Sequence, residues 1–555
     1  SGPIAAILAL AAYGYAAGGG PSVGRATLAA VLYLAARALD HRAPPLNALA
    51  VTLAVAVLAS PLDLYDPGLA LSFGATLALI AGAERITASS SFGTRPPSRP
   101  CNVVAPASLA VARRKVLASG GWHSALLRAA LGLGTATVCA EIAVMPLSAL
   151  AFGRVTAAGL ALNFVAIPLM AVVQISGLVI VGADPLAPPL ADLAARVANL
   201  CASAVMASTA LLDLAPWLAW RVPAPSVLLL IVYYGAWALV LATTRARRVA
   251  LVVAVCTGIA IASPPVTTLS PGTSHFVRHQ ARDTRHQALE VAVLDVGQGD
   301  SILISLPSGR RVLVDAGGTV ASTFDMGGRV VAPALVALGV RRLDALAFTH
   351  PDPDHLGGAR AILRDFGPVE IWEGAPVPRH PARRALALEA ARRGIGWRTL
   401  QAGAHLGDGI AEIDVLHPPP PDWERQQARN DDSVVLDVRL GGVSILLTGD
   451  IGRDTERTLI PSLRPAAIRI LKAAHHGSAT STSAEFLQAA RPAAVIFSAG
   501  RDNRFGHPAP SVLSRVAASH AEIFRTDQDG AITITTDGHE VAIATMTGRK
   551  VQCRH

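Results

Sequence analysis

The chain has 555 residues, of which 52% are hydrophobic and 16% are charged. It is too long for one domain and too apolar for a protein that is dissolved in water along its whole length. The formal net charge of +9 suits an anionic partner, either a nucleic acid or an acidic lipid surface, and charge alone does not choose between them. The five cysteines are scattered without a C-x-x-C pair, so neither a zinc ribbon nor a disulfide framework is predicted.

Residues 1–263 contain a series of apolar runs and few charges. The nine runs lie near residues 4–18, 26–39, 46–60, 68–83, 126–150, 156–182, 190–213, 226–244 and 249–263. We predict an all-α polytopic membrane domain, because charge-free runs recur too often for a soluble helical core, which is the alternative. Several runs are shorter than the ~20 residues of a simple crossing, and we expect half-helices or re-entrant segments among them. The chain begins inside an apolar run without Met, so we expect an N-terminal portion to precede it.

Basic residues set the expected orientation of the membrane domain. Lys and Arg gather in residues 37–42, 84–124 and 245–248. If these three segments face the cytoplasm and the apolar runs alternate, Ser1 lies inside and the chain leaves the last run on the other face. We therefore expect a multi-pass protein of the cell membrane with its C-terminal domain on the non-cytoplasmic side.

Three polar residues lie within or beside the apolar runs, where a polar side chain needs a partner. Glu141 follows TATVCA, Asn163 precedes FVAIPLM, and Arg25 follows a cluster of glycines. One interpretation is a water-lined membrane pathway, with Glu141 as the best single candidate for its lining. Helix packing with internally satisfied polar groups is an equal alternative.

The character of the chain changes after residue 263. Residues 264–287 are rich in Pro, Ser, Thr and His and have no apolar period, so we interpret them as a linker. Across residues 288–555, short β-like runs alternate with helical stretches, which predicts a layered α/β domain. The G-x-G within residues 293–300 lacks the third glycine of a dinucleotide loop, so a strand, a tight turn and a second strand are predicted there.

The segment FTHPDPDHLGG, residues 348–358, follows a β-like run and leads into a helical pattern. His350, Asp352, Asp354 and His355 fall within six residues, and imidazoles and carboxylates packed this closely bind divalent metal ions. Without a cation, the like charges of Asp352 and Asp354 would repel each other at close range. The alternative is a polar turn in which Asp354 caps the following helix.

Further candidate ligands close later β-like runs. Asp450 ends VSILLTGD, where one carboxylate is well placed to bridge two metal ions, and His475 and His476 follow IRILKAA. Other polar residues in comparable positions are Asn430, Ser433, Ser478, Asn503 and His507. Each alone is a weak signal, since Gly-Asp after a strand is usually a turn. Together, at the ends of successive strands after the His/Asp motif, they form a specific pattern.

The motif of residues 350–355 resembles the metallo-β-lactamase superfamily signature H-x-H-x-D-H, with Asp352 in place of a histidine. A carboxylate is a harder ligand than an imidazole, so Mn or Mg would suit this set of ligands as well as Zn. Segments along the chain also resemble, in order, the ComEC family of competence DNA-uptake channels. They are GRATLAA, DPGLALSF, MPLSALAFG and NFVAIPL in the first part, and VLDVGQGDSILI, LVDAGG, FTHPDPDHLGG, NDDSVVL, LLTGD, LKAAHHGS and a GHP stretch in the second.

The resemblance implies that a metallo-β-lactamase-like αββα sandwich follows the membrane domain. It implies an inner-membrane channel that passes one DNA strand inward, with an outward-facing, metal-dependent nuclease domain that degrades the other strand. DNA, membrane lipid, DNA-delivery proteins and a cytoplasmic motor protein are the implied partners. One or two divalent metal ions are implied as cofactors, with Mn or Zn ahead of Mg.

The same resemblance carries residue roles onto this chain. The implied metal ligands are His350, Asp352, Asp354, His355, Asp450 and one histidine of the 475/476 pair, for which we choose His475. The implied catalytic residues are Asp354, His476 and His507, and the implied substrate contacts are Asn430, Ser433, Ser478 and Asn503. The family's usual histidine between the first motif and Gly-Asp has no clear equivalent, and Asn430 or Asp431 lies nearest to its place. Lys472 is interpreted as a surface residue in preference to a phosphate contact.

Two other hypotheses stay open. The first is a membrane-anchored metallohydrolase, a phosphodiesterase that transports no DNA. The second is a metal-free scaffold domain. The apolar runs supply few basic residues for a polyanion, so a channel would have to depend on backbone dipoles, helix ends and an external driver.

Overall fold

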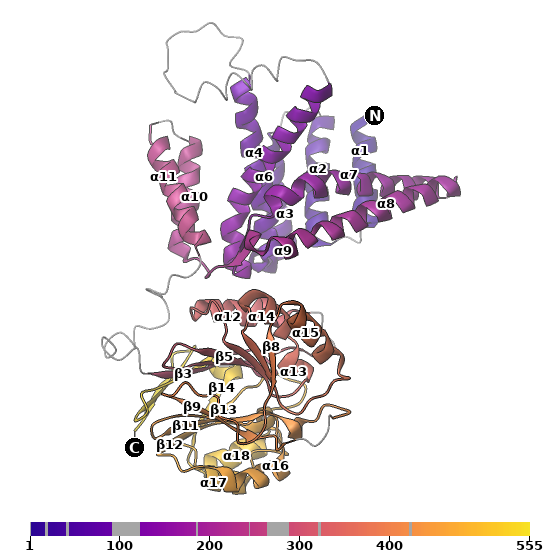
Figure 1. Cartoon of the computed structure of the whole chain (residues 1–555). Coiled ribbons are helices and arrows are strands. Elements are labelled where there is room, and N and C mark those ends of the chain that lie inside the picture. The colour runs from indigo at the N-terminus through magenta and orange to yellow at the C-terminus, as the bar shows by residue number, and fades with distance from the viewer. Residues whose placement is uncertain are drawn as a thin grey trace. The chain divides into compact units, whose positions relative to one another are not determined.

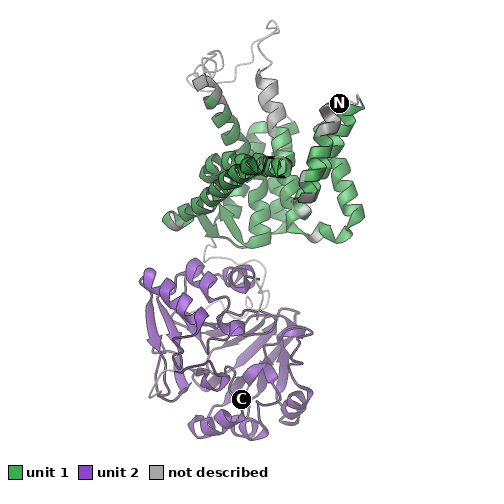
Figure 2. Cartoon of the chain, turned by 90° about the vertical axis from the view of Figure 1, so that its right-hand side faces the viewer, with its two compact units in different colours: residues 1–264 green, residues 265–555 purple. Residues whose placement is uncertain are grey.

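The computed structural model describes residues 2–16, 20–39, 44–90, 122–184, 187–242, 245–263, 288–319, 324–420 and 425–554. The chain divides into two compact units, Ser1–Pro264 and Pro265–His555 (Figure 2). The predicted linker, residues 264–287, and most of the predicted basic segment 84–124 lie outside the described residues.

Unit 1 is helical, and a helix falls on each of the predicted apolar runs (Figure 1). These helices are α1 (Gly2–Ala16), α2 (Pro21–Ala38), α3 (Pro45–Ala59), α4 (Pro67–Ser90), α6 (Trp122–Phe152), α7 (Gly159–Ala183), α8 (Pro188–Ser208), α10 (Val227–Ala242) and α11 (Arg247–Ala262). Short elements join them: η1 (Pro61–Tyr65), α9 (Ala210–Leu214), η3 (Pro216–Leu218) and a two-stranded sheet of β1 (Arg154–Thr156) and β2 (Ala219–Arg221). Within the described residues, three segments are long and apolar enough to cross a membrane, namely Ala129–Phe152, Gly159–Ala183 and Pro188–Leu212.

Pro146 lies inside α6 and shapes the contact of that helix with α10. Proline has no N–H, so the carbonyl of Ile142, four residues earlier, loses its helical donor. The hydroxyl of Tyr233 from α10 donates to that carbonyl at 2.8 Å, and the hydroxyl of Tyr234 donates to the carbonyl of Ala143 at 2.8 Å. Tyr233 thus replaces the hydrogen bond that the proline removes from α6, and Tyr234 adds a second hydrogen bond between the two helices.

Unit 2 contains two β-sheets. The nine-stranded sheet has the order β17-β16-β15-β3-β4-β5-β6-β7-β8, with β3 (Leu289–Val293), β4 (Ile302–Ser305), β5 (Arg311–Val314), β6 (Ala345–Phe348), β7 (Glu370–Glu373), β8 (Gly396–Thr399), β15 (Ile532–Thr536), β16 (Val541–Thr545) and β17 (Lys550–Cys553). The six-stranded sheet has the order β14-β13-β12-β11-β10-β9, with β9 (Glu412–His417), β10 (Val435–Leu440), β11 (Val443–Leu447), β12 (Ile468–Lys472), β13 (Ala494–Phe497) and β14 (Glu522–Arg525). Strands β5 to β8 run parallel to one another, and so do β11 to β14.

Helices separate many of these strands along the chain. The longer ones are α12 (Ala332–Ala337), which continues η4 (Gly327–Val331), α14 (Ala359–Phe366), α15 (Pro381–Arg392), α16 (Arg453–Leu459), α17 (Ala484–Ala490) and α18 (Pro510–Ala518). Single turns complete the set: α13 (Pro353–Leu356), η5 (Asn430–Asp432), η6 (Ile460–Ser462), η7 (Ala474–Gly477) and α19 (Thr526–Asp529).

The two sheets face each other, and helices cover their outer faces (Figure 1). Side chains from both sheets form the central core, among them Ile304 and Val312 from one sheet and Ile445 and Ile470 from the other. The second core packs α12, α14 and α15 on the nine-stranded sheet, and the third packs α16, α17 and α18 on the six-stranded sheet. Burial on both faces explains why β6 and β13 are apolar at every position. This αββα sandwich after a helical unit confirms the predicted fold class.

Candidate metal centre

The residues of the His/Asp motif and the later candidates lie at the ends of buried strands from both sheets. His350 follows β6, Asp315 follows β5, Asp450 follows β11, and His476 lies in the turn after β12. The carboxyl ends of parallel strands meet at one edge of a sheet. The facing edges of the sandwich therefore collect groups from distant parts of the chain, as the sequence analysis predicted for strand ends.

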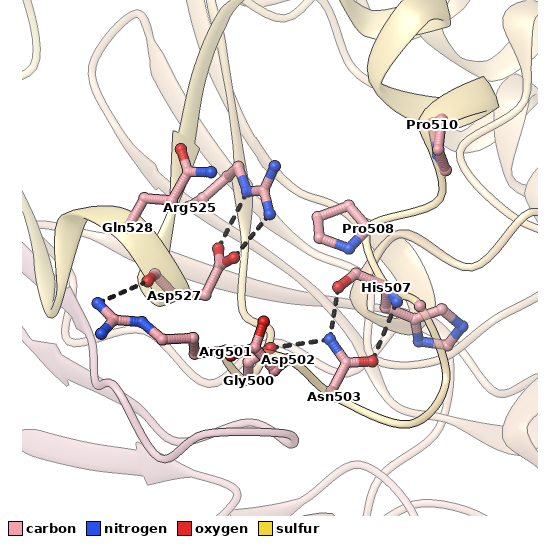
Figure 3. Close-up of a pocket in the computed structure, with 11 residues that line it drawn as sticks. Gly500, Arg501, Asp502, Asn503, His507, Pro508, Pro510, Arg525, Asp527 and Gln528 are labelled. Atoms are coloured by element: carbon pink, nitrogen blue, oxygen red, sulfur yellow. Dashed lines mark hydrogen bonds and ion pairs between the residues drawn. The ribbon is translucent and has the colours of Figure 1, made fainter.

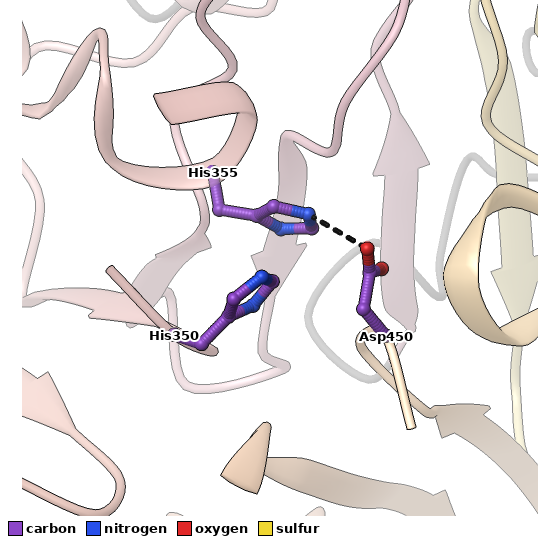
Figure 4. Close-up of side chains that lie close together, drawn as sticks. All are labelled: His350, His355 and Asp450. Atoms are coloured by element: carbon purple, nitrogen blue, oxygen red, sulfur yellow. Dashed lines mark ion pairs between the residues drawn. The ribbon is translucent and has the colours of Figure 1, made fainter. Parts of the chain in front are cut away.

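The carboxylate of Asp450 lies at the middle of the cluster. Its Oδ2 atom is 3.3 Å from Nε2 of His355 and 3.2 Å from Nε2 of His476. Figure 4 shows His350 and His355 beside this carboxylate, and the ligand atoms of these three residues lie within 4.8 Å of one another. Asp354, His355 and His476 meet the same limit. Imidazole nitrogens and carboxylate oxygens at this spacing form a donor set for divalent ions.

Hydrogen bonds orient the imidazoles of His355 and His476. Nδ1 of His355 lies 2.8 Å from Oδ2 of Asp315, whose carboxylate also accepts from Thr349 N–H at 2.7 Å. Nδ1 of His476 donates to the carbonyl of Ser498 at 2.9 Å. A histidine that donates through Nδ1 presents the lone pair of Nε2 to a metal ion. Both Nε2 atoms therefore face Asp450 as potential ligands.

Several buried polar atoms at this site have no hydrogen-bond partner among the described residues. They are Nε2 of His355, Nε2 of His476, Oδ1 of Asp450 and Oδ1 of Asp300. Burial lowers the pKa of His355, but Asp450 and Asp315 outweigh burial and raise this pKa well above its usual value; the pKa of His476 is raised in the same way by Asp450 and Asp300. The neighbouring carboxylates favour a positive charge at these imidazoles, and either a proton or a metal ion on Nε2 would supply it. The unpartnered donor atoms therefore fit a divalent metal ion.

Asp300 and Lys472 form a buried ion pair next to the cluster. This pair was not predicted from the sequence. Both side chains are 1% exposed, and the ammonium of Lys472 contacts Oδ2 of Asp300 and lies 3.7 Å from Oδ1 of Asp450. The prediction that Lys472 lies on the surface is wrong, because β12 is buried on both faces. The predicted tight turn after β3 delivers Asp300: Gly299 has a φ of +127°, and a Cβ there would collide with the carbonyl of Asp354.

The histidine pair takes two different positions. His476 is buried in the cluster, whereas His475 lies at the rim, with Nε2 3.9 Å from Oδ2 of Asp450 and 3.1 Å from Nδ2 of Asn430. Both residues have positive φ angles, 50° and 54°, and this turn sends the two rings in different directions. Neighbouring letters in the sequence could not have distinguished them.

The remaining predicted contacts surround the cluster. Asp352 places Oδ2 3.5 Å from Nε2 of His350, and Ser433 Oγ accepts from Asp450 N–H at 3.1 Å. Ser478 is buried, and its hydroxyl lies 3.0 Å from that of Thr480. Asp431, the other residue considered for the place of the missing histidine, accepts from Gly452 N–H instead.

A pocket of about 660 Å³ lies beside the cluster, and His507 forms part of its wall (Figure 3). The side chain of Asn503 closes this loop by donating to the carbonyl of His507 at 2.6 Å and accepting from its N–H at 3.0 Å. The His507 ring lies 5.7 Å from that of His475. Burial lowers the pKa of His507 to about 4, and the neighbouring His475 and His476 add to the shift. His507 is therefore neutral at pH 7, and a neutral imidazole is an acceptor of protons.

In unit 1, the three residues of the predicted pathway lie in two places. Glu141 of α6 and Asn163 of α7 both lie close to Gly159, where an added Cβ would collide with the Glu141 carboxylate. Arg25 of α2 lies instead beside the loop between α3 and α4. The role of these residues in a membrane pathway stays a prediction.

Comparison with known proteins matches both units. Residues 2–247 match the family model described as competence protein, and residues 294–501 match that of the metallo-β-lactamase superfamily. ComE operon protein 3 of Bacillus subtilis is 34% identical over 254 residues, which are 44% of this chain and 32% of that protein. Competence protein ComA of Neisseria gonorrhoeae is 32% identical over 294 residues, which are 51% of this chain and 38% of that protein. The chain thus spans about a third of the length of these curated relatives.

Among solved structures, the metallo-β-lactamase fold protein YhfI from Bacillus subtilis aligns with 42% of this chain and 95% of its own, at 12% identity and a TM-score of 0.29. The family matches imply divalent metal ions as cofactors of unit 2, and the apolar helices of unit 1 are those of a membrane protein. With a competence domain followed by a metallo-β-lactamase domain, and with relatives named as competence proteins, the chain belongs to the ComEC family of competence proteins.

Proposed function

We propose that the chain takes up single-stranded DNA through the membrane and that unit 2 is a metal-dependent nuclease acting on the strand that is not transported. One observation carries the enzymatic part: buried, unpartnered Nε2 atoms of His355 and His476 face the carboxylate of Asp450. Family membership supports the transport part. The net charge of +9 also complements a polyanion.

His350, Asp352, Asp354, His355, Asp450 and His476 would hold one or two divalent ions. Asp450 would be a shared ligand, because it belongs both to the group with His350 and His355 and to the group with Asp300 and His476. This assignment moves the ligand role from His475 to His476, because Nε2 of His476 is closer to Asp450 and is unpartnered. The mixture of imidazole and carboxylate suits Mn or Zn first and Mg next. Such ions, when bound, supply charge stabilisation and an activated water for phosphodiester hydrolysis.

The residues at the rim would position the nucleic acid. The pocket beside His507 is lined by Arg501 and Arg525, and its volume of about 660 Å³ is sufficient for a nucleotide next to the scissile phosphate. Neutral His507 would accept a hydrogen bond from water. Asn503 would act through the loop, since its side chain holds His507 by two hydrogen bonds.

Asp450→Asn tests the enzymatic proposal in the full chain, purified in lipid nanodiscs. We expect the wild type to bind Mn or Zn and to degrade one strand of labelled duplex DNA. Asp450→Asn should lower the cleavage rate at least about a hundredfold and reduce the bound metal, because it removes the shared ligand. Asp454→Asn is the matched control, since that carboxylate is 95% exposed and should change neither quantity.

Other outcomes would redirect or end the proposal. Metal binding and hydrolysis of a small phosphodiester, without cleavage or uptake of DNA, would favour a membrane-anchored phosphodiesterase. A wild type that binds no Mn, Zn or Mg under saturating supply would remove the enzyme altogether and leave a scaffold domain.

A further inference from the structure

A cavity of about 470 Å³ lies among α2, α3 and α4 of unit 1. Most of its wall is apolar, and Tyr33 of α2 and Phe73 of α4 contribute aromatic rings to it. Arg25 lines the same cavity and is only 8% exposed. The cavity therefore combines one buried cation with apolar and aromatic surface, all from a single compact unit.

The guanidinium of Arg25 is largely without hydrogen bonds. One nitrogen, Nη2, donates to Ser22 Oγ at 3.3 Å, while Nε and Nη1 are buried and have no hydrogen-bond partner among the described residues. A guanidinium carries five N–H donors in a planar fork. Leaving most of these donors unsatisfied away from water is costly unless an anion completes them.

Two acidic residues lie near Arg25 but do not complete its hydrogen bonds. Nη1 is 3.8 Å from Oδ2 of Asp63 and 3.6 Å from Oδ2 of Asp66. The other oxygen of each carboxylate is committed locally, to Ser60 Oγ at 2.7 Å and to Gly68 N–H at 2.9 Å. The loop thus fixes both carboxylates where they balance the charge of Arg25 and leave its planar fork open.

We propose that Arg25 binds a backbone phosphate of single-stranded DNA in this cavity, and that Asp63 and Asp66 balance the charge of Arg25 when no phosphate is bound. A phosphate offers the paired oxygens that match a guanidinium. Aromatic side chains beside a basic group are the usual platform for unstacked bases, and this favours a nucleic acid strand over a phospholipid. The inference rests on the proposed uptake of DNA and names one contact of that path.

The test measures binding of a labelled oligonucleotide to the full chain in nanodiscs of neutral lipid, across a range of salt concentrations. Arg25→Gln should weaken binding about ten- to a hundredfold, as expected for loss of a charge-assisted pair. The slope of log affinity against log salt should become shallower by about 0.7 for one lost phosphate contact. The double variant Asp63→Asn with Asp66→Asn should bind more tightly, because the competing carboxylates are gone.

A purely structural ion pair predicts a different pattern. Arg25→Gln and the double Asn variant would then both lower the free energy of unfolding. The triple variant, which removes all three charges, would restore it. That result would overturn the inference, and so would an unchanged salt slope in Arg25→Gln. A third result would replace DNA by a lipid phosphate as the ligand. In that case Arg25→Gln would lose binding of added anionic phospholipid and would bind the oligonucleotide as the wild type does.

Failure of the inference can be told apart from failure of the proposed function. DNA uptake is measured in parallel in cells that carry the wild type or Arg25→Gln. A wild type that neither binds nor takes up DNA contradicts the proposed function, and the inference with it. A wild type that takes up DNA, with Arg25→Gln equal to it at the same membrane abundance, contradicts the inference alone.

Discussion

At the scale of single residues, the buried ammonium of Lys472 balances part of the negative charge of Asp300 and Asp450 at the metal centre. Its ammonium contacts Asp300, lies 3.7 Å from Asp450 Oδ1, and donates to the carbonyl of Gly449 at 3.2 Å. Burial lowers the pKa of Lys472, but Asp300 and Asp450 outweigh burial and raise it. The lysine therefore stays charged, contacts Oδ2 of Asp300 and lies on the Oδ1 side of Asp450, while Oδ2 of Asp450 is the oxygen near the imidazoles.

Lys472→Met is therefore expected to destabilise unit 2 by about 3–5 kcal/mol, because it leaves buried carboxylates without their partner. Adding Asp300→Asn should recover part of this loss, since one uncompensated charge disappears. Hydrogen exchange of the β12 amides in the full chain, with metal removed by chelation, measures both changes. A double variant as unstable as Lys472→Met would show that the pair is not the source of the effect.

At the scale of elements, α6 and α10 depend on each other through a proline. The carbonyl of Ile142 receives its hydrogen bond from Tyr233, which is 2% exposed, because Pro146 cannot supply one. A carbonyl without a hydrogen bond costs free energy in an apolar environment. The Tyr233 hydroxyl removes that cost for the Ile142 carbonyl and so stabilises the packing of α6 against α10. Tyr233 also belongs to a buried apolar cluster that includes Ala149 of α6 and Ile261 of α11.

Tyr233→Phe should destabilise the contact between α6 and α10 by about 1–3 kcal/mol through loss of this hydrogen bond. The same change is then made in a Pro146→Ala variant, in which the N–H of residue 146 can donate to the Ile142 carbonyl. The destabilisation caused by Tyr233→Phe should fall there to a few tenths of its value in the wild type. Unfolding in mixed micelles, followed by hydrogen exchange in α6, measures the cycle. An equal effect in both backgrounds would mean that the ring, and not the hydroxyl, matters.

At the scale of the whole molecule, the side of the membrane that unit 2 faces follows from the number of crossings. The sequence predicts nine crossings, whereas three segments of the described residues meet the length and composition of a span. Both numbers are odd. With the basic segment 84–124 in the cytoplasm, three crossings or nine leave unit 2 on the opposite side.

A reporter pair tests this orientation. Alkaline phosphatase fused after His555 should be active, because it folds only outside the cytoplasm, and green fluorescent protein at the same point should be dark. Fusions at Ala246, between α10 and α11, should give the reverse under nine crossings. Phosphatase activity at both points would support three crossings, and a fluorescent fusion after His555 would place unit 2 in the cytoplasm.

From the amino-acid sequence alone we could predict the two-part fold, the apolar helices and the close spacing of His350, Asp352, Asp354 and His355. These features are local, since burial of a strand or helix leaves its period in neighbouring letters and one turn holds the whole motif. The sequence also indicated Asp450 correctly as a residue at a strand end beside the motif, because strand ends share an edge.

The identity of the other groups at the metal centre follows from contacts between distant parts of the folded chain. Asp300 and Lys472 are 172 positions apart and meet because β3 and β12 belong to facing sheets. The choice between His475 and His476 depended on a left-handed turn, and the surroundings of Arg25 depended on the loop between α3 and α4. Contacts of this kind arise from packing between elements, and no periodicity along one element records its partner in another.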